Sequence, residues 1–248
     1  MRALWSRPLA CMPILTIAAL FYLSAAHAFA ATMTGQITLV DSKDSAVRKQ
    51  KDFSGVAVWL TPLNGRFLGI AHKRAQMLQK DKRFIPHVLA ISTGTTVDFP
   101  NLDPIFHNAF SNFDGQLFDV ALYPPGSSRS VLFDRPGIVR VFCNIHPSMS
   151  AIIVVVNSNH IVTTENDGSF RFTNVEPGDY RIHFFHERTT PETLAHLTQR
   201  ITVPEEGYDL PVVKISEAGY IPVAHKNKYG RDYPPDAETS DSYSLPIK

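Results

Sequence analysis

Three residues whose side chains can bind a soft metal ion lie within one short stretch of the chain. Cys143 is followed by His146 and Met149, and His107 lies 36 positions before the cysteine. A loop over residues 143–149 could fold the thiol, the imidazole and the thioether around one point, and His107 is the candidate for a second imidazole. One thiolate and two imidazoles in a trigonal plane, with a weak axial thioether, form the ligand set that suits copper in electron-transfer sites.

The residues before Cys143 have the alternation of a β-strand that begins at Gly137. Val139, Val141 and Cys143 fall on one face of this run. Arg140, which lies between them, falls on the opposite face. The thiol is therefore predicted to reach the end of the strand pointing towards a core. A buried cysteine in a strand usually packs as a small hydrophobic residue, so an inert buried thiol is the alternative interpretation.

Several motifs around these residues resemble those of the cupredoxins, the blue copper proteins that include plastocyanin and amicyanin. The resemblance extends from Val88 to Val154, and the short ligand loop is most similar to that of amicyanin. The motifs are Phe84-Ile85-Pro86, the run from Gly94 to Phe99, Asn101 with Asp103, His107-Asn108, and Cys-x2-His-x2-Met.

The resemblance implies one mononuclear copper ion, held by His107, Cys143, His146 and Met149. It also implies that Asn108 holds the sulfur through its backbone amide, which is a supporting role behind the ligands. The alternative is a cupredoxin-shaped domain that has kept these residues without binding copper.

Residues 1–30 resemble an export signal that is removed from the mature protein. Arg2 and Arg7 precede an apolar run from Ile14 to Leu23, and small residues suitable for cleavage lie near Ala28 and Ala30. We therefore expect a periplasmic or secreted protein with no membrane span after cleavage. Cleavage also leaves Cys143 as the single cysteine, and a lone thiol in an oxidising compartment is a liability unless it is buried or bound to metal.

The charge balance and the motifs exclude several classes of function. The chain has 24 Lys and Arg against 23 Asp and Glu, and it shows no basic, aromatic-rich face of the kind that binds nucleic acid. Nucleophile elbows, phosphate-binding loops and His-Glu-x2-His helices are also absent from the sequence. We therefore expect a protein that is not an enzyme.

Short alternating runs separated by Gly, Pro and Asn predict an all-β protein. Ala151 to Val156 is continuously apolar, which predicts a strand buried on both faces. Thr163 to Phe172 contains Asn166-Asp167-Gly168 and predicts a hairpin. This hairpin and the Pro177-Gly178-Asp179-Tyr180 turn resemble the carboxypeptidase regulatory-like, transthyretin-type sandwich.

The combined prediction is a cupredoxin-like Greek-key β-barrel or sandwich together with a second, small transthyretin-type β-sandwich. We expect the second sandwich to be split in sequence by insertion of the first at a surface loop. The competing interpretation is two consecutive domains, with residues 33–63 belonging to the cupredoxin-like one. The expected ranges are 1–30 for the signal, 33–63 for the first sandwich strands, 66–156 for the cupredoxin-like domain, 157–216 for the rest of the sandwich, and 217–248 for a loosely ordered tail.

Three functions remain open on the sequence alone. The first is an exported one-electron carrier, with a redox partner protein docking at the imidazole edge of His146 beside Pro147. The second is a copper-handling module without redox turnover, and the third is a metal-free sandwich that binds a protein or a glycan. The combined architecture also resembles exported proteins associated with methylamine utilisation, which favours the electron carrier by association.

Overall fold

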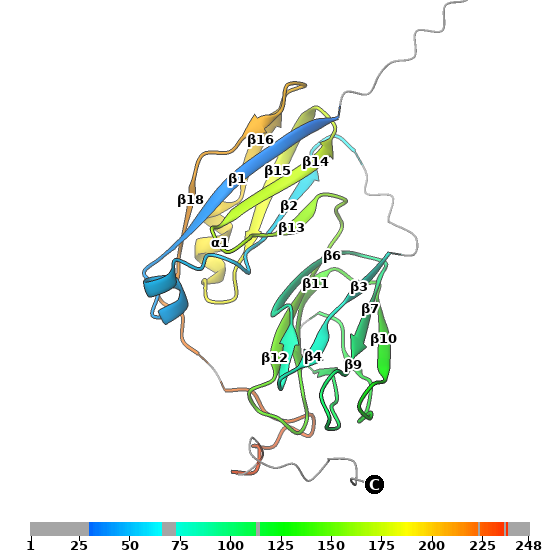
Figure 1. The fold of residues 1–248 in the computed structure, drawn as a ribbon. Coiled ribbons are helices and arrows are strands. Elements are labelled where there is room, and N and C mark those ends of the chain that lie inside the picture. Colours follow the sequence, from blue (N-terminus) through cyan, green and yellow to red (C-terminus); the bar gives the residue numbers. More distant parts are fainter. Residues whose placement is uncertain (1–29, 66–72, 113–114, 223, 236, 238–248) are drawn as a thin grey trace, which may run out of the picture.

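The structure is a computed structural model that describes residues 30–65, 73–112, 115–222, 224–235 and 237. It confirms the prediction of an all-β protein, because nearly all of its elements are strands arranged in several sheets. The strands form two parts, one above the other in Figure 1. Among the described residues no helix is long and apolar enough to span a bilayer. The predicted export signal lies outside them, apart from Ala30.

The upper part in Figure 1 is built from two four-stranded sheets that enclose one hydrophobic core. The first sheet has the order β14 (Ser169–Val175), β1 (Ala31–Val40) and β17 (Tyr208–Asp209), and β18 (Val213–Ser216) also pairs with β1. The second sheet has the order β13 (Ile161–Thr163), β2 (Ala57–Pro62), β15 (Gly178–Phe185) and β16 (Gln199–Val203). Met33 and Leu60 lie in the same core as Ile182 and Ile215, so residues from the two ends of the chain are packed together.

The lower part in Figure 1 contains the strands between Arg74 and Val156. One sheet has the order β10 (Ser128–Phe133), β7 (Thr95–Pro100) and β3 (Arg74–Gln76), and β4 (Leu78–Lys80) pairs separately with β5 (Arg83–Ile85). The other sheet has the order β6 (Val88–Ser92), β12 (Ser150–Val156), β11 (Gly137–Phe142), β8 (Phe110–Ser111) and β9 (Phe118–Asp119). The described strands leave the sheets open, so this part is a sandwich and not a closed barrel.

Two short helices lie in the upper part, in segments where the alternation of apolar residues is absent. The π-helix η1 (Ala46–Gln50) follows β1. The α-helix α1 (Pro191–Leu197) follows β15 and begins with proline, whose missing N–H would have no partner at this position. Thr190 caps α1 because its hydroxyl accepts a hydrogen bond from the backbone N–H of Thr193 at 3.3 Å.

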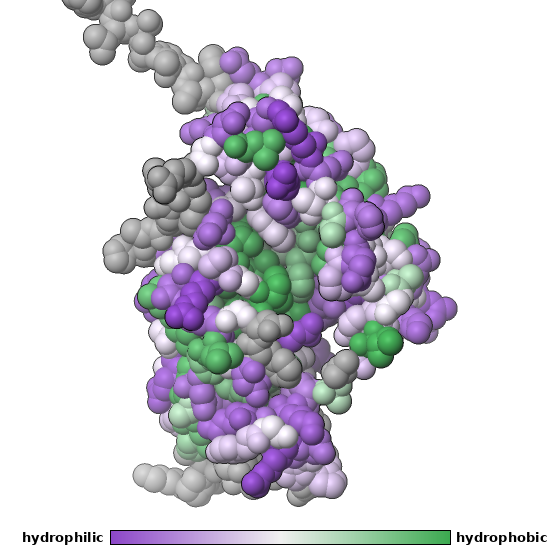
Figure 2. Space-filling model, turned by 180° about the vertical axis from the view of Figure 1, so that it is seen from behind, coloured by the Kyte–Doolittle hydropathy of each residue, from purple (hydrophilic) through white to green (hydrophobic). Residues whose placement is uncertain are grey.

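Strand β12 packs against both parts, which explains its continuous apolar sequence. Ala151, Ile153 and Val155 point into the core of the lower part. Ile152, Val154 and Val156 alternate with them and pack against Ala57 and Trp59 of the upper part. Seen from behind, hydrophobic residues gather in a hollow between the two parts (Figure 2). The two parts are therefore joined by a hydrophobic contact as well as by the chain.

The predicted hairpin over Thr163 to Phe172 is wrong. The turn at its centre forms as expected, because the N–H of Glu165 donates to Ser169 and the N–H of Gly168 donates to Glu165. The flanking strands separate after this turn: β13 pairs with β2 and β14 pairs with β1, in different sheets. The turn therefore connects the two layers of the sandwich, because each strand finds its partner in the N-terminal segment.

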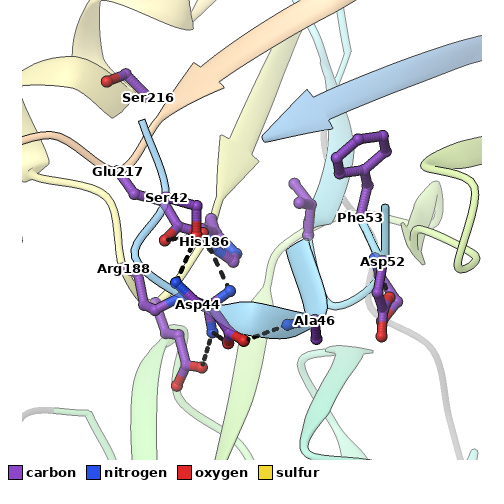
Figure 3. A network of polar contacts seen from close by, with 12 residues as sticks. Ser42, Asp44, Ala46, Asp52, Phe53, His186, Arg188, Ser216 and Glu217 are labelled. Carbon is purple, nitrogen blue, oxygen red and sulfur yellow. Dashed lines mark hydrogen bonds and ion pairs between the residues drawn. The ribbon is translucent and has the colours of Figure 1, made fainter. Parts of the chain in front are cut away.

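Glu217 marks the point where the chain leaves the upper part after β18. Its carboxylate accepts hydrogen bonds from His186 Nε2 at 3.0 Å, Arg188 Nη2 at 3.0 Å and Ser42 Oγ at 2.7 Å (Figure 3). Burial raises the pKa of this carboxyl, but the three hydrogen bonds outweigh burial and hold its pKa at about 2. Beyond Glu217 the chain runs down to the lower part (Figure 1).

Candidate metal centre

The loop that carries Cys143, His146 and Met149 connects two paired strands. Strands β11 and β12 are antiparallel, with Phe142 opposite Ser150, so residues 143–149 form a closed connection between them. The N–H of Cys143 donates to the carbonyl of Met149 at 3.1 Å, and the N–H of Met149 donates to the carbonyl of His146 at 3.1 Å. These bonds fold the loop back on itself, so its side chains can face one point.

The strand before the loop has the predicted orientation. Val139, Val141 and Cys143 are fully buried in the core of the lower part, whereas Arg140 is exposed. The thiol therefore enters the core from the end of β11, as the alternation of the sequence indicates.

His107 reaches the same point from the loop between β7 and β8. Asn101 shapes this loop, because its side-chain oxygen accepts from the N–H of Asp103 at 3.0 Å and its amide donates to the carbonyl of Ile105 at 2.8 Å. His107 then pairs through its backbone with Tyr123. Pairing of Phe110 with Phe142 sets this segment beside β11. Asn101 and Asp103 therefore stabilise the loop that leads to His107.

The side chains of His107, Cys143 and His146 converge in the interior. The two Nδ1 atoms of the histidines lie 3.2 Å apart, and Sγ of Cys143 lies 3.6 Å from Nδ1 of His146. All three donor atoms lie within 4.8 Å of one another. Within the part of the chain that the structure describes, they form the group of three His, Cys, Asp or Glu residues that could hold a metal ion.

These spacings fit a trigonal metal ion. With bonds of about 2.0 Å to nitrogen and about 2.3 Å to sulfur at angles of 120°, the nitrogens lie about 3.5 Å apart and each nitrogen lies about 3.7 Å from the sulfur. The observed separations of 3.2 Å between the two nitrogens and 3.6 Å between His146 and the sulfur are close to these values, and the His107 and Cys143 donors lie within 4.8 Å of each other. The donor set of one thiol and two imidazoles also matches the chemistry that copper prefers. Both the geometry and the donor types therefore fit copper.

Met149 lies beside this group in the sequence and is completely buried in the same core as Cys143. Its backbone closes the ligand loop, which places its side chain at the start of β12. Its role as the axial ligand stays a prediction.

Asp103 holds the imidazole of His107 from behind. Its Oδ2 lies 2.7 Å from Nε2 of His107, and its carboxylate also accepts the backbone N–H groups of Asp81 at 2.6 Å and Lys82 at 2.9 Å. Burial raises the pKa of Asp103, but these hydrogen bonds outweigh it and leave the pKa lowered. The carboxylate is therefore ionised and can only accept, so Nε2 of His107 carries the hydrogen and Nδ1 carries the lone pair.

Burial also lowers the pKa of His107, although Asp103 opposes this effect. The imidazole is completely enclosed, and its neutral form is the one that can donate a lone pair to a metal. Asp103 and burial thus leave the lone pair of His107 on Nδ1, which is the form of the ring that a metal ion can bind. A carboxylate behind a metal-binding histidine fixes the ring and increases its basicity.

Asn108 links the two ligand segments through its side chain. Its Oδ1 accepts the backbone N–H of Asn144 at 3.1 Å, and its Nδ2 donates to Asp119 at 2.7 Å. Asn108 directly follows His107, and Asn144 directly follows Cys143. Their hydrogen bond therefore fixes the segment of His107 relative to the loop that carries Cys143. The expected contact of its backbone amide with the sulfur stays a prediction.

His146 does not present an open edge to solvent in this structure, because only 1% of the residue is exposed. The expectation of an exposed docking edge at this imidazole therefore differs from the observed conformation. Sequence reasoning also missed His225 and Tyr233, which bond to the ligand loop from the C-terminal segment. No spacing in the sequence connects them to residues some 80 to 90 positions earlier.

No protein-family model matches the chain, and no curated protein matches it. Solved structures match about a third of it. The Cu-containing nitrite reductase from Thermus scotoductus SA-01 is 29% identical over 33% of this chain, which spans 22% of that protein, with a TM-score of 0.32. A purple cupredoxin from Nitrosopumilus maritimus is 26% identical over 33% of this chain and 98% of its own, with a TM-score of 0.31.

A reduced mutant of amicyanin is 18% identical over 39% of this chain and 97% of its own, with a TM-score of 0.32. These neighbours are a Cu-containing nitrite reductase, a purple cupredoxin and an amicyanin. Each likeness covers between 33% and 39% of this chain.

Proposed function

We propose that the chain is a one-electron carrier, in which His107, Cys143 and His146 would hold one mononuclear copper ion and the thioether of Met149 would be a weaker fourth ligand. The observation that supports this is the convergence of two imidazole nitrogens and one sulfur at 3.2 Å and 3.6 Å in a fully enclosed position. Bound copper would supply exchange between two oxidation states, and a mixed sulfur and nitrogen ligand set suits both of them.

We propose a carrier and not an enzyme because the metal position is closed. His107, Cys143 and Met149 are 0% exposed, so the site has no open position at which a substrate could bind. Enclosure also keeps water away from the donors. Asp103 holds the ring of His107 and Asn108 holds the backbone after Cys143, so these donors would need little rearrangement if bound copper changed oxidation state.

A copper-handling module without redox turnover is the second candidate. The observation that favours it is the coverage of His146, because a carrier usually offers a partner an accessible route to its metal. The third candidate is a metal-free sandwich that binds a protein or a glycan. In that case His107, Cys143 and His146 would be buried residues of a cupredoxin-shaped domain that does not bind copper.

Copper titration of the purified protein separates these functions. Intense blue absorption with Cu(II) supports the electron carrier, since it reports a thiolate bonded to copper. Tight, colourless binding of Cu(I) alone supports the copper-handling module, and no binding by a folded protein supports the third reading. Cys143→Ser should abolish the blue colour while the upper sandwich stays folded, whereas His196→Gln, on the exposed face of α1, should leave the colour unchanged as a control.

We also propose the domain organisation and location that suit this function. The pairing of β1 and β2 with strands beyond residue 156 supports one sandwich that is split by a cupredoxin-like insertion over residues 66–156. An export signal at residues 1–30 would place the protein in the periplasm or outside the cell, where a redox partner protein would exchange electrons with it. The resemblance to proteins associated with methylamine utilisation agrees with such a partner.

A further inference from the structure

The ligand loop is covered by residues 224–235, which come from the C-terminal segment beyond the sandwich. We refer to these residues as the strap. In Figure 1 the segment runs from the end of β18 past the lower part and ends below it. Earlier in the same C-terminal segment, the polar network of Glu217 ties the chain to the upper part. The strap therefore follows a residue that is tied to the sandwich, and its own contacts are with the ligand loop and its neighbours in the lower part.

Two side chains of the strap bond to backbone carbonyls of the ligand loop. The hydroxyl of Tyr233 donates to the carbonyl of Cys143 at 2.7 Å. Nε2 of His225 lies 2.8 Å from the carbonyl of Pro147, and because a carbonyl can only accept, this nitrogen carries the hydrogen. Both carbonyls belong to the seven-residue loop that supplies the thiol and the second imidazole. The strap therefore acts on the loop backbone and not on the ligand atoms.

Further contacts hold the strap in register on this surface. The ring of His225 stacks on Phe142 at the end of β11, with centroids 4.0 Å apart. The backbone N–H of Lys228 donates to the side-chain oxygen of Asn144 at 3.0 Å. The ammonium of Lys228 lies 2.8 Å from Asp119, the residue that also accepts from Asn108. The strap is thus connected to both segments that carry the ligands.

The strap also has its own local order. The side-chain oxygen of Asn227 accepts the N–H groups of Tyr229 at 3.0 Å and Arg231 at 3.1 Å. The N–H of Asn227 donates to Arg231, which closes a tight turn between the His225 and Tyr233 contacts. A preformed turn presents the two donors together, so binding of one brings the other into range.

We propose that the strap positions the ligand loop of the metal centre and shields His146, so that metal or electron exchange at this edge requires the strap to lift. The role in metal or electron exchange rests on the proposed function. The contacts between the strap and the loop are present in the protein without metal. The strap bonds to Asn144 and Pro147, which lie on either side of His146 in the loop, and His146 itself is 1% exposed. His225 and Tyr233 thereby gain roles beyond the ligand set.

The test compares the rate at which iodoacetamide alkylates Cys143 in the metal-free full chain, followed by mass spectrometry of the peptide that contains it. The variant with His225→Ala and Tyr233→Phe removes both bonds to the loop. The matched control, His196→Ala with Tyr208→Phe, makes the same changes in the upper part, away from the strap and the ligand loop. Each lost hydrogen bond is expected to accelerate alkylation about fivefold, and the control is expected to react at the wild-type rate.

The single change Tyr233→Phe keeps the ring and removes only the hydroxyl, so it decides the question if the double variant does not fold. Equal alkylation rates in wild type and Tyr233→Phe would overturn the proposal. Release of bound Cu(I) to bathocuproine disulfonate provides the second readout, and it should be faster in the same variants.

The two readouts distinguish the strap from the proposed function. Faster alkylation of the variants, together with no copper binding by the wild type, supports the strap and rejects the copper carrier. Copper binding with unchanged rates of both alkylation and Cu(I) release rejects the strap and leaves the copper carrier standing.

Discussion

Replacing Asp103 by Asn should weaken copper binding without touching a ligand. The carboxylate of Asp103 accepts three N–H groups, from His107, Asp81 and Lys82, at 2.7, 2.6 and 2.9 Å. An amide has one accepting oxygen and no charge, so it cannot satisfy the same three donors. The ring of His107 then loses the partner that fixes its orientation and tautomer.

The expected size of the effect follows from these contacts. Loss of a supporting partner behind a metal-binding histidine typically costs 10- to 100-fold in metal affinity, or about 1.4 to 2.7 kcal/mol. Hydrogen bonds to a charged group contribute about 1.5–3 kcal/mol each, so loss of one should lower the free energy of unfolding of the metal-free protein by about 2 kcal/mol. The Cu(II)/Cu(I) potential should rise, because a less basic imidazole stabilises Cu(II) less.

The assay is a competition titration with a chromophoric Cu(I) chelator, together with urea unfolding of the metal-free protein. Asp98→Asn is the matched control, because Asp98 lies on β7 in the same part but pairs with Ser130 and with Arg74, whose side chain is 61% exposed. These contacts join β7 to β3 and β10 and do not involve His107 or residues 143–149, so copper affinity should not change.

One result would refute the reasoning. If Asp103→Asn lowers the stability of the metal-free protein but leaves copper affinity and potential equal to those of Asp98→Asn, then Asp103 only supports the fold. In that case the polarisation of His107 by the carboxylate plays no part in metal binding.

Two further predictions concern the upper sandwich. Glu217 has a pKa of about 2 against an ordinary value of 4.5, so its contribution of up to about 3 kcal/mol is fully present above pH 4.5 and is lost as the pH falls towards 2. In acid titrations of unfolding free energy, Glu217→Gln should therefore flatten the profile between these pH values, and an unchanged profile would contradict the assignment. Gly168→Ala should destabilise the sandwich by more than about 2 kcal/mol in urea, because the new Cβ would lie 2.0 Å from the carbonyl oxygen of Ile37 at a φ of +83°. Gly126→Ala, with a φ of +72° and nothing within 4 Å, isolates the backbone strain and should cost only about 1–2 kcal/mol.

Local sequence determined the orientation of the strands that matter for the site. The alternation from Gly137 placed the thiol of Cys143 in the core, because successive side chains of a strand point to opposite faces. The unbroken apolar run of β12 likewise predicted burial on both faces. The spacing within residues 143–149 was sufficient to suggest that one loop carries three donors. These features depend only on neighbours within a few residues, so the sequence contains the information.

Tertiary structure alone decided which segments meet. The turn at Asn166 to Gly168 was visible in the sequence, but its strands pair with β1 and β2, whose partners depend on the whole sandwich. The bond of Asp103 to His107, and the contacts of His225 and Tyr233 with the ligand loop, are of the same kind. The bond between Asp103 and His107 depends on how their loop closes. The contacts of His225 with Pro147 and of Tyr233 with Cys143 join residues that are 78 and 90 positions apart. Side-chain periodicity specifies a face, whereas the neighbour on that face depends on how distant segments pack, and local sequence does not encode this.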